Sequence, residues 1–139
     1  MIFPVVIIAI VLLAIGVLVA VGLEPGAPSA EVALGFEHAW DLLDSDSVYK
    51  LSGSELHDGL DRPAFVAAKR EAYRDRAELG RLVRGSSVES QVQEGDAAVV
   101  VTRLELRDGS VVHHAIQLVR RTRTWQVVGY ALRPTTVPP

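Results

Sequence analysis

The spacing of hydrophobic and polar residues divides the chain into three parts. Residues 2–23 are apolar without interruption and contain no charged side chain. Between residues 29 and 80, apolar side chains recur every three or four positions, which is the spacing of amphipathic helices. After residue 85 they alternate with polar side chains, as in strands buried on one face. This order predicts one apolar helix followed by a small α+β domain.

The apolar segment at residues 2–23 is long enough to be a transmembrane anchor. A helix of this length spans roughly 33 Å, and the hydrocarbon core of a bilayer is about 30 Å thick. A cleaved signal peptide is the alternative, but its apolar region is normally about 7 to 15 residues long and follows a basic start, which this chain lacks. We therefore expect a retained single-pass anchor at 1–23, a linker at 24–29, a domain at 30–134 and a disordered tail at 135–139.

Few charges flank the predicted anchor, so its orientation depends on weak signals. No Lys or Arg precedes Lys50, and the positive-inside rule therefore has little to act on. The terminal amine on one side and Glu24 on the other favour an N-terminus inside the cell. We expect an anchor in the cytoplasmic membrane, with the domain on its outer side.

Three helical segments are expected in the first half of the domain. Ser29 is placed to cap a helix that ends near Asp44. A second helical piece follows, and a third helix begins at Asp61, has Pro63 in its first turn and runs to Gly80. The apolar positions of these segments include Val32, Phe36, Ala39, Trp40, Leu43, Val48, Tyr49, Leu51, Leu56, Phe65, Ala68, Ala72 and Tyr73.

Four strands are expected in the second half, separated by turn residues. The predicted strands cover residues 86–93, 97–107, 110–120 and 124–133, joined by three hairpin turns into an antiparallel meander. We expect the helices to cover one face of this sheet. That face carries Ala98, Val100, Leu104, Leu106, Val112, Ile116, Leu118, Trp125 and Val127.

The order of three helices and four strands resembles the nuclear-transport-factor-two-like (cystatin-like, SnoaL-like) superfamily. The segments that carry the resemblance are Phe36 to Trp40 in the first helix, Phe65 to Arg70 in the third, and Trp125 to Tyr130 in the last strand. The resemblance implies a bacterial protein in which three helices pack on a curved four-stranded sheet around a cone-shaped pocket. Members include isomerases, cyclases and dehydratases as well as anchored proteins without a known role, so the resemblance leaves the use of the pocket open.

Composition excludes several kinds of site. The chain has no cysteine, which rules out disulfides, zinc–thiolate sites and iron–sulfur clusters. It also lacks the short motifs of nucleotide-binding loops, zinc peptidases and serine hydrolases. The net charge of residues 24–61 is −8 and that of residues 62–139 is +5, but the basic residues are mixed with acidic ones. We therefore expect no nucleic acid as a partner.

Two groups of residues suggest a metal site, and both fail on geometry. His113 and His114 are adjacent on a predicted strand, so their side chains point to opposite faces and cannot chelate one ion together. Asp41, Asp44 and Asp46 resemble the start of a calcium loop, but the glycine and the closing glutamate of such a loop are missing. We expect no metal and no cofactor.

Pocket residues are predicted from the expected cone. An isomerase-like site needs a base carboxylate and a tyrosine or protonated acid, and the sequence offers Asp41 and Tyr130 among other polar groups. The catalytic pattern of the superfamily does not map onto these residues, so no catalytic residue is assigned. The pocket candidates are Trp40, Tyr49, Tyr73, His114 and Trp125.

These observations favour a non-catalytic role. We expect a membrane-anchored binding or assembly module for a protein partner or a small apolar ligand, with homodimer formation through the sheet as a further expectation. The alternative is a small cofactor-free enzyme of the isomerase, cyclase or dehydratase type. A carboxylate or His114 inside the pocket, within hydrogen-bond reach of a tyrosine, would favour the enzyme.

Overall fold

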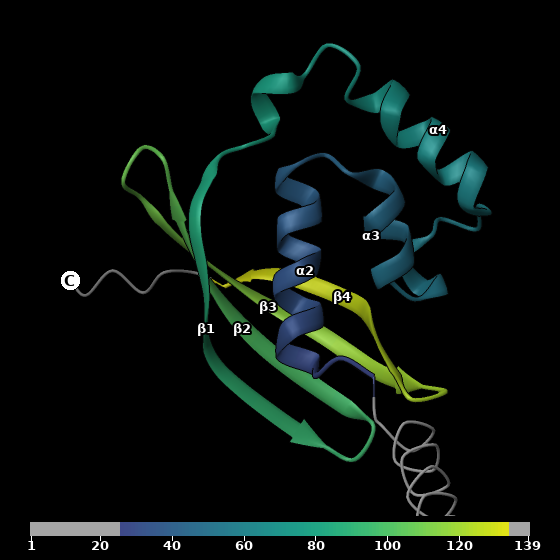
Figure 1. Ribbon diagram of the computed structural model, residues 1–139, viewed down its shortest axis with the longest axis vertical. Coiled ribbons are helices and arrows are strands. Elements are labelled where there is room, and N and C mark those ends of the chain that lie inside the picture. Colours follow the sequence, from purple (N-terminus) through teal and green to yellow (C-terminus); the bar gives the residue numbers. More distant parts are fainter. Residues whose placement is uncertain (1–25, 134–139) are drawn as a thin grey trace, which may run out of the picture.

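The computed structural model describes residues 26–133, which form helices packed on one antiparallel sheet (Figure 1). The sheet has the strand order β1-β2-β3-β4, so each strand pairs with its neighbours in sequence. The predicted α+β meander is therefore confirmed. The helical elements are α2 (Ser29–Asp41), α3 (Ser45–Leu51), η1 (Ser54–Leu56), α4 (Arg62–Ala72) and η2 (Ala77–Leu79), and the strands are β1 (Val83–Glu94), β2 (Ala97–Leu106), β3 (Val111–Arg121) and β4 (Thr124–Arg133).

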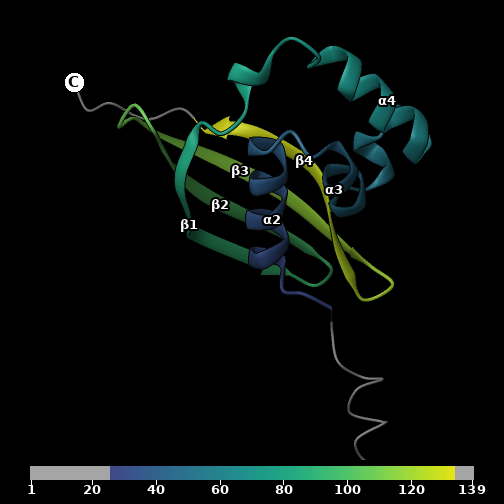
Figure 2. The same ribbon diagram turned by 45° about the horizontal axis from the view of Figure 1, so that its top comes forward.

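Helix α2 lies along one face of the curved sheet, and α3 and α4 lie beside it towards β4 (Figures 1 and 2). The face that α2 covers is the one predicted from the alternation of the strands. Burial of these apolar side chains is the main stabilising term of such a core. The core cluster consists of Val32, Ala33, Phe36, Ala39, Val48, Phe65, Ala98, Val100, Ile116, Leu118, Trp125 and Val127.

The start of α2 differs from the prediction. Ser29 is the first residue of the helix rather than its cap, and the capping position is Pro28, which makes no side-chain hydrogen bond. Ser29 is only 1% exposed, and its hydroxyl accepts a hydrogen bond of 2.8 Å from Nε2 of Gln91 in β1. The hydroxyl of Ser29 therefore accepts a hydrogen bond from the sheet and none from the backbone N–H groups at the start of its own helix.

The ends of two helices also differ. The first helix ends at Asp41, three residues early, because Leu43 has a left-handed φ of 53°. The third helix ends at Ala72 instead of Gly80, and a short 3-10 turn follows. The segment after this turn is bonded to Asp41. Oδ1 of Asp41 accepts hydrogen bonds from the backbone N–H groups of residue 82 at 2.7 Å and residue 83 at 3.0 Å. These bonds explain why β1 begins at Val83, before the predicted residue 86.

The predicted membrane anchor lies outside the described residues. Within residues 26–133, no helix is long and apolar enough to cross a membrane. The anchor at 1–23 and the tail at 135–139 therefore stay predictions, as does homodimer formation through the sheet.

Candidate ligand-binding cavity

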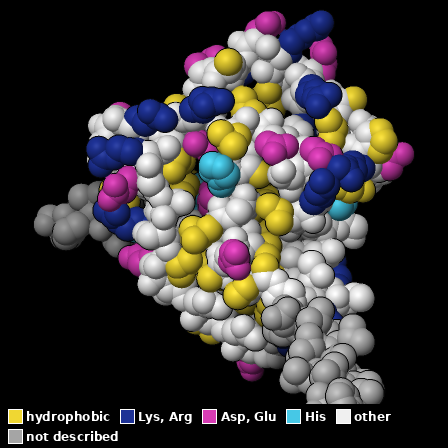
Figure 3. Space-filling model, viewed as in Figure 1, with side chains coloured by type: hydrophobic (Ala, Val, Ile, Leu, Met, Phe, Trp, Pro, Cys, Tyr) yellow, Lys and Arg dark blue, Asp and Glu magenta, His cyan; other side chains and the backbone are white. Residues whose placement is uncertain are grey.

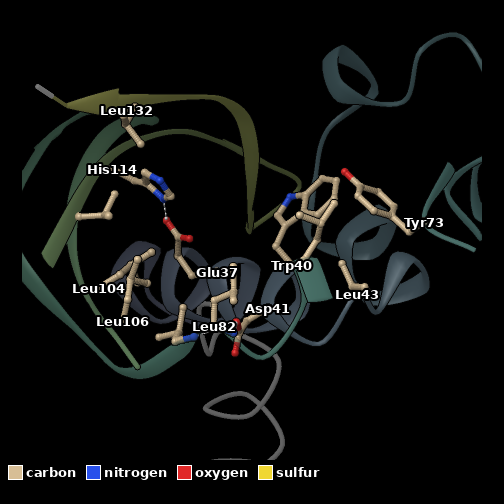
Figure 4. A pocket seen from close by; sticks show the side chains of 13 residues that line it. Glu37, Trp40, Asp41, Leu43, Tyr73, Leu82, Leu104, Leu106, His114 and Leu132 are labelled. Atoms are coloured by element: carbon tan, nitrogen blue, oxygen red, sulfur yellow. Dashed lines mark hydrogen bonds and ion pairs between the residues drawn. The ribbon is translucent and has the colours of Figure 1, made fainter. Parts of the chain in front are cut away.

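A cavity of about 400 Å³ lies between the C-terminal end of α2, the segment that joins α4 to β1, and strands β2 to β4. We call it the central cavity. Most of its wall is apolar, as is usual for sites that bind small molecules. Figure 4 shows Glu37 and His114 facing each other on one side, with Trp40 and Tyr73 across from them. The lining residues are Glu37, Trp40, Asp41, Leu43, Tyr73, Leu79, Leu82, Val83, Leu104, Leu106, Val112, His114 and Leu132.

The polar centre of the cavity is an ion pair between α2 and β3. Glu37 is only 7% exposed, and its Oε1 lies 2.7 Å from Nδ1 of His114. The hydroxyl of Thr102, which is fully buried, donates a hydrogen bond of 3.0 Å to the same oxygen. Thr102 and His114 are register partners on β2 and β3, so both side chains leave the sheet on the face that α2 covers.

The pair changes the acid–base behaviour of His114. The hydrogen bond with Glu37 raises the pKa of the imidazole above its ordinary value, against the opposing effect of burial. Protonated imidazole donates from both ring nitrogens. With Nδ1 bonded to Glu37, the Nε2–H is the group through which this pair can bind an acceptor on a ligand.

The two adjacent histidines lie on opposite faces of β3, as predicted. Nε2 of His113 lies 3.1 Å from Oε2 of Glu89, whereas His114 pairs with Glu37. The two imidazoles therefore have separate carboxylate partners and do not form a joint chelating site.

A second cavity of about 250 Å³ adjoins the central one and shares Glu37, Trp40, Tyr73 and His114 with it. Nε1 of Trp40 is buried and has no hydrogen-bond partner among the described residues. A buried donor without a partner is costly, so an acceptor on a ligand would stabilise it. Tyr130 also lines this cavity, and burial, followed by the proximity of Tyr73, raises the pKa of its phenol.

The structure brings together three of the five predicted pocket residues. Trp40, Tyr73 and His114 line both cavities. Tyr49 lies elsewhere, stacked on the imidazole of a neighbouring histidine with ring centroids 3.8 Å apart. Trp125 lies in the core and is only 5% exposed. The guanidinium carbon of Arg120 lies over its ring, 5.3 Å from the ring centroid.

Sequence reasoning missed Glu37 and Thr102, the two groups that complete the polar centre. Glu37 did carry a signal, because it lies among Ala33, Phe36 and Trp40 on the buried stripe of α2. A carboxylate in such a stripe needs a partner. Thr102 gave no comparable signal, since threonine is common in strands.

The carboxylates of the calcium-like segment have other roles. Asp41 accepts the backbone bonds at the start of β1, and Asp44 caps α3 by accepting a hydrogen bond from the N–H of Ser47 at 3.2 Å. The bonds from Ser47 lower the pKa of Asp44. Asp46 pairs with Arg62 at 2.5 Å. Each carboxylate thus has its own partner.

Comparisons with known proteins identify the fold alone. No family model and no curated protein matches the chain. A Campylobacter jejuni structure, whose name proposes an NTF2-like (nuclear-transport-factor-two-like) transpeptidase, matches with a TM-score of 0.56 and 16% identity over 73% of this chain and 97% of its own. An NTF2-like protein of unknown function from Silicibacter pomeroyi gives a TM-score of 0.49 and 15% identity over 74% of this chain and 91% of its own. The match to the Campylobacter jejuni structure shows that the domain has the NTF2-like fold, in agreement with the resemblance found in the sequence.

Proposed function

We propose that the domain binds a small, largely apolar molecule in the central cavity and holds one polar group of it at His114 and Trp40. The observation that carries this proposal is the pair of buried Glu37 and half-buried His114 in the wall of a mostly apolar cavity of about 400 Å³. Cavities with this combination of apolar lining and a few convergent polar groups are typical ligand sites. The apolar wall supplies affinity, and the two N–H donors orient the ligand.

Binding is favoured over catalysis by the arrangement of the tyrosines. An isomerase-like reaction needs a base and a separate donor that stabilises the developing oxyanion. Among residues 26–133, the hydrogen bonds of Glu37 and His114 run to each other and to Thr102, and none joins them to a tyrosine hydroxyl.

Catalysis stays the second candidate because Tyr73 lines the same cavity as the carboxylate. Its test is deuterium exchange at the carbon beside the carbonyl of an added cyclic ketone. If Glu37 is a general base, the protein accelerates the exchange, and Glu37→Gln removes the acceleration. Equal exchange with the protein and with buffer would exclude proton abstraction from this class of substrate.

Ligand binding is tested on the full chain in lipid nanodiscs, with isotope-labelled tryptophan. Trp40 lines the cavity and Trp125 lies in the core. Octanol is added, and the indole N–H signals of both residues are followed by NMR. We expect saturable movement of the Trp40 signal and none of the Trp125 signal. Equal movement of both signals, or of neither, would contradict the proposal.

A matched pair of valine variants separates cavity binding from surface binding. Val112 lines the cavity, whereas Val111 is its neighbour on β3 and is not a lining residue. Adjacent strand residues point to opposite faces. Val112→Phe should fill the cavity and weaken octanol binding, and Val111→Phe should not. If the two variants bind octanol equally, the ligand lies outside the cavity.

We also propose that this domain is held at the outer side of the cytoplasmic membrane. The support is the uninterrupted apolar segment at residues 2–23 and the acidic residue Glu24 that follows it. The test is trypsin treatment of intact spheroplasts, with lysed cells as the control. Cleavage at the exposed turn around Arg123 is expected without lysis. Protection in spheroplasts with cleavage after lysis would reverse the orientation.

A further inference from the structure

We infer that the ligand of the central cavity is an anionic amphiphile, whose carboxylate or phosphate head binds in a neighbouring hollow lined by Arg81, Arg84 and Arg107. This inference rests on the proposed function, because it places the apolar part of the same molecule in the central cavity. It adds the chemical class of the ligand and a site for its charged end, which lies in the hollow and not at His114 and Trp40.

The hollow lies between the C-terminal end of α2 and the start of β1 and has a volume of about 240 Å³. We call it the arginine hollow. It shares Glu37, Asp41 and Val83 with the central cavity, so the two volumes have a wall in common. The two volumes are therefore adjacent, and the proposal places the apolar chain in one and the charged end in the other. The lining residues are Glu37, His38, Asp41, Leu42, Arg81, Val83, Arg84, Gly85, Ser86 and Arg107.

Two of the three arginines have no acidic partner in the part of the chain that the structure describes. Arg84 forms an ion pair with Glu105 at 3.3 Å. Arg107 donates from Nε to the backbone oxygen of Arg81 at 2.7 Å, and no carboxylate of residues 26–133 is paired with the guanidinium group of Arg81 or of Arg107. Guanidinium groups bind carboxylates and phosphates through paired hydrogen bonds, so these two are available for such a head group.

The acidic groups of the hollow are already neutralised or bonded. Glu37 is paired with His114, whose imidazole has a raised pKa. Oδ1 of Asp41 accepts two backbone N–H groups, which offset its charge locally. Against these two carboxylates stand Arg81 and Arg107, while Arg84 is balanced by Glu105. The net field in the hollow is therefore positive and favours an anion.

The backbone at Arg81 supports a specific use of this side chain. Its φ is +57°, a left-handed conformation that is strained for any residue with a Cβ atom. The strain is held by hydrogen bonds, since the N–H of Arg81 donates to the backbone oxygen of Asp41 and its own carbonyl accepts from Arg107. Glycine would adopt this conformation without strain. This backbone conformation sets the direction of the Cα–Cβ bond of Arg81, which is one of the lining residues of the hollow.

The surface around the hollow agrees with this assignment. Figure 3 shows Lys and Arg side chains gathered near the start of β1 and the β2–β3 turn, beside a strip of apolar side chains over the helix and sheet. The hollow lies at the C-terminal end of α2, whereas the predicted anchor joins the domain at the other end of this helix, about 20 Å away. This separation favours a dissolved amphiphile over a lipid of the surrounding bilayer.

The test compares octanoate, octyl phosphate and octanol on the full chain in phosphatidylcholine nanodiscs, with the Trp40 indole signal as the readout. We expect at least one of the two anions to bind about tenfold more tightly than octanol at equal free concentration, because a charge-assisted head contact is added to the same apolar contacts. Equal affinities of the alcohol and both anions would overturn the inference while leaving the proposed function intact. If none of the three moves the signal, both proposals fail.

Matched variants assign the head group to the hollow. Arg81→Gln combined with Arg107→Gln should remove the preference for the anion and leave the octanol affinity within about twofold. The control is Arg74→Gln combined with Arg76→Gln, which removes the same charge from an exposed segment. An equal loss in both double variants would show a general charge effect and refute the hollow. The Trp125 signal reports whether each variant is folded.

A change of bilayer tests the source of the ligand. If phosphatidylglycerol replaces phosphatidylcholine in the nanodiscs, a dissolved amphiphile should still be needed to move the Trp40 signal. Movement on changing the lipid alone, lost in the Arg81 and Arg107 double variant, would assign the head group to the bilayer and overturn the dissolved source.

Discussion

Removing the hydroxyl of Thr102 is expected to destabilise the domain because it leaves Glu37 with one donor fewer. Thr102 is fully buried, and its 3.0 Å bond to the carboxylate of Glu37 is one of two bonds to the same oxygen. A hydrogen bond to a charged group contributes about 1.5–3 kcal/mol. Thr102→Val replaces the hydroxyl by a methyl group, which returns up to about 0.8 kcal/mol through apolar burial. The expected loss in the free energy of unfolding is therefore about 1–2 kcal/mol.

The assay is urea denaturation of a chain that begins at Glu24, followed by tryptophan fluorescence. Thr102→Val is measured alone and together with Glu37→Gln, since a neutral acceptor forms a weaker bond and the cost should fall by about half. Thr124→Val, at the exposed first residue of β4, is the control and should change stability by less than about 0.5 kcal/mol. If Thr102→Val costs no more than this control, or costs the same with and without Glu37, the carboxylate does not depend on the hydroxyl.

Three further predictions follow from the anchor, the core and the ion pair. Deleting residues 1–23 should give a soluble folded domain by circular dichroism, and aggregation at low concentration would show that the boundary is wrong. Trp125→Ala should cost about 3–5 kcal/mol in urea denaturation and Trp40→Ala less, because Trp125 is in the core and Trp40 lines a cavity; the reverse order would contradict the assignment. The folded pKa of His114 is raised, so its advantage over His114→Gln should be complete below about pH 6.5 and should disappear as the pH rises through the folded value. A difference in stability that stays constant from about pH 6 to pH 9 would refute the role of the charged imidazole.

The strands were predictable because their ends carry local signals. Gly95 and Gly109 have positive φ values of 59° and 87° in the turns that precede β2 and β3, and such residues mark hairpins in the sequence. Between the turns, the alternation of apolar and polar residues determines which face is buried. The predicted strands at 97–107 and 124–133 accordingly match Ala97–Leu106 and Thr124–Arg133.

The end of α4 and the start of β1 were not predictable in the same way. The start of β1 depends on Asp41, which binds backbone groups 41 and 42 residues further along the chain. No local pattern encodes a contact of this range. The candidate cavity shows the same limit, since Tyr49 and Trp40 are both aromatic residues at helical spacing, yet only Trp40 faces the cavity.

The Glu37–His114 pair shows how such a site can nevertheless be read from sequence. Glu37 is a charge within the apolar stripe of α2, and His114 shares the inward face of β3 with Val112 and Ile116. Each is a polar residue at a position where the pattern of its element predicts an apolar one. Either residue alone could be explained as a hydrogen-bonded polar group of the core. Helix α2 lies across β2 and β3, so the two exceptions must meet on the buried side of the sheet. Buried polar groups need partners. When a helix and the strand that it covers each have one polar residue on the buried face, the two residues are therefore best considered as partners of each other before either is assigned a separate role.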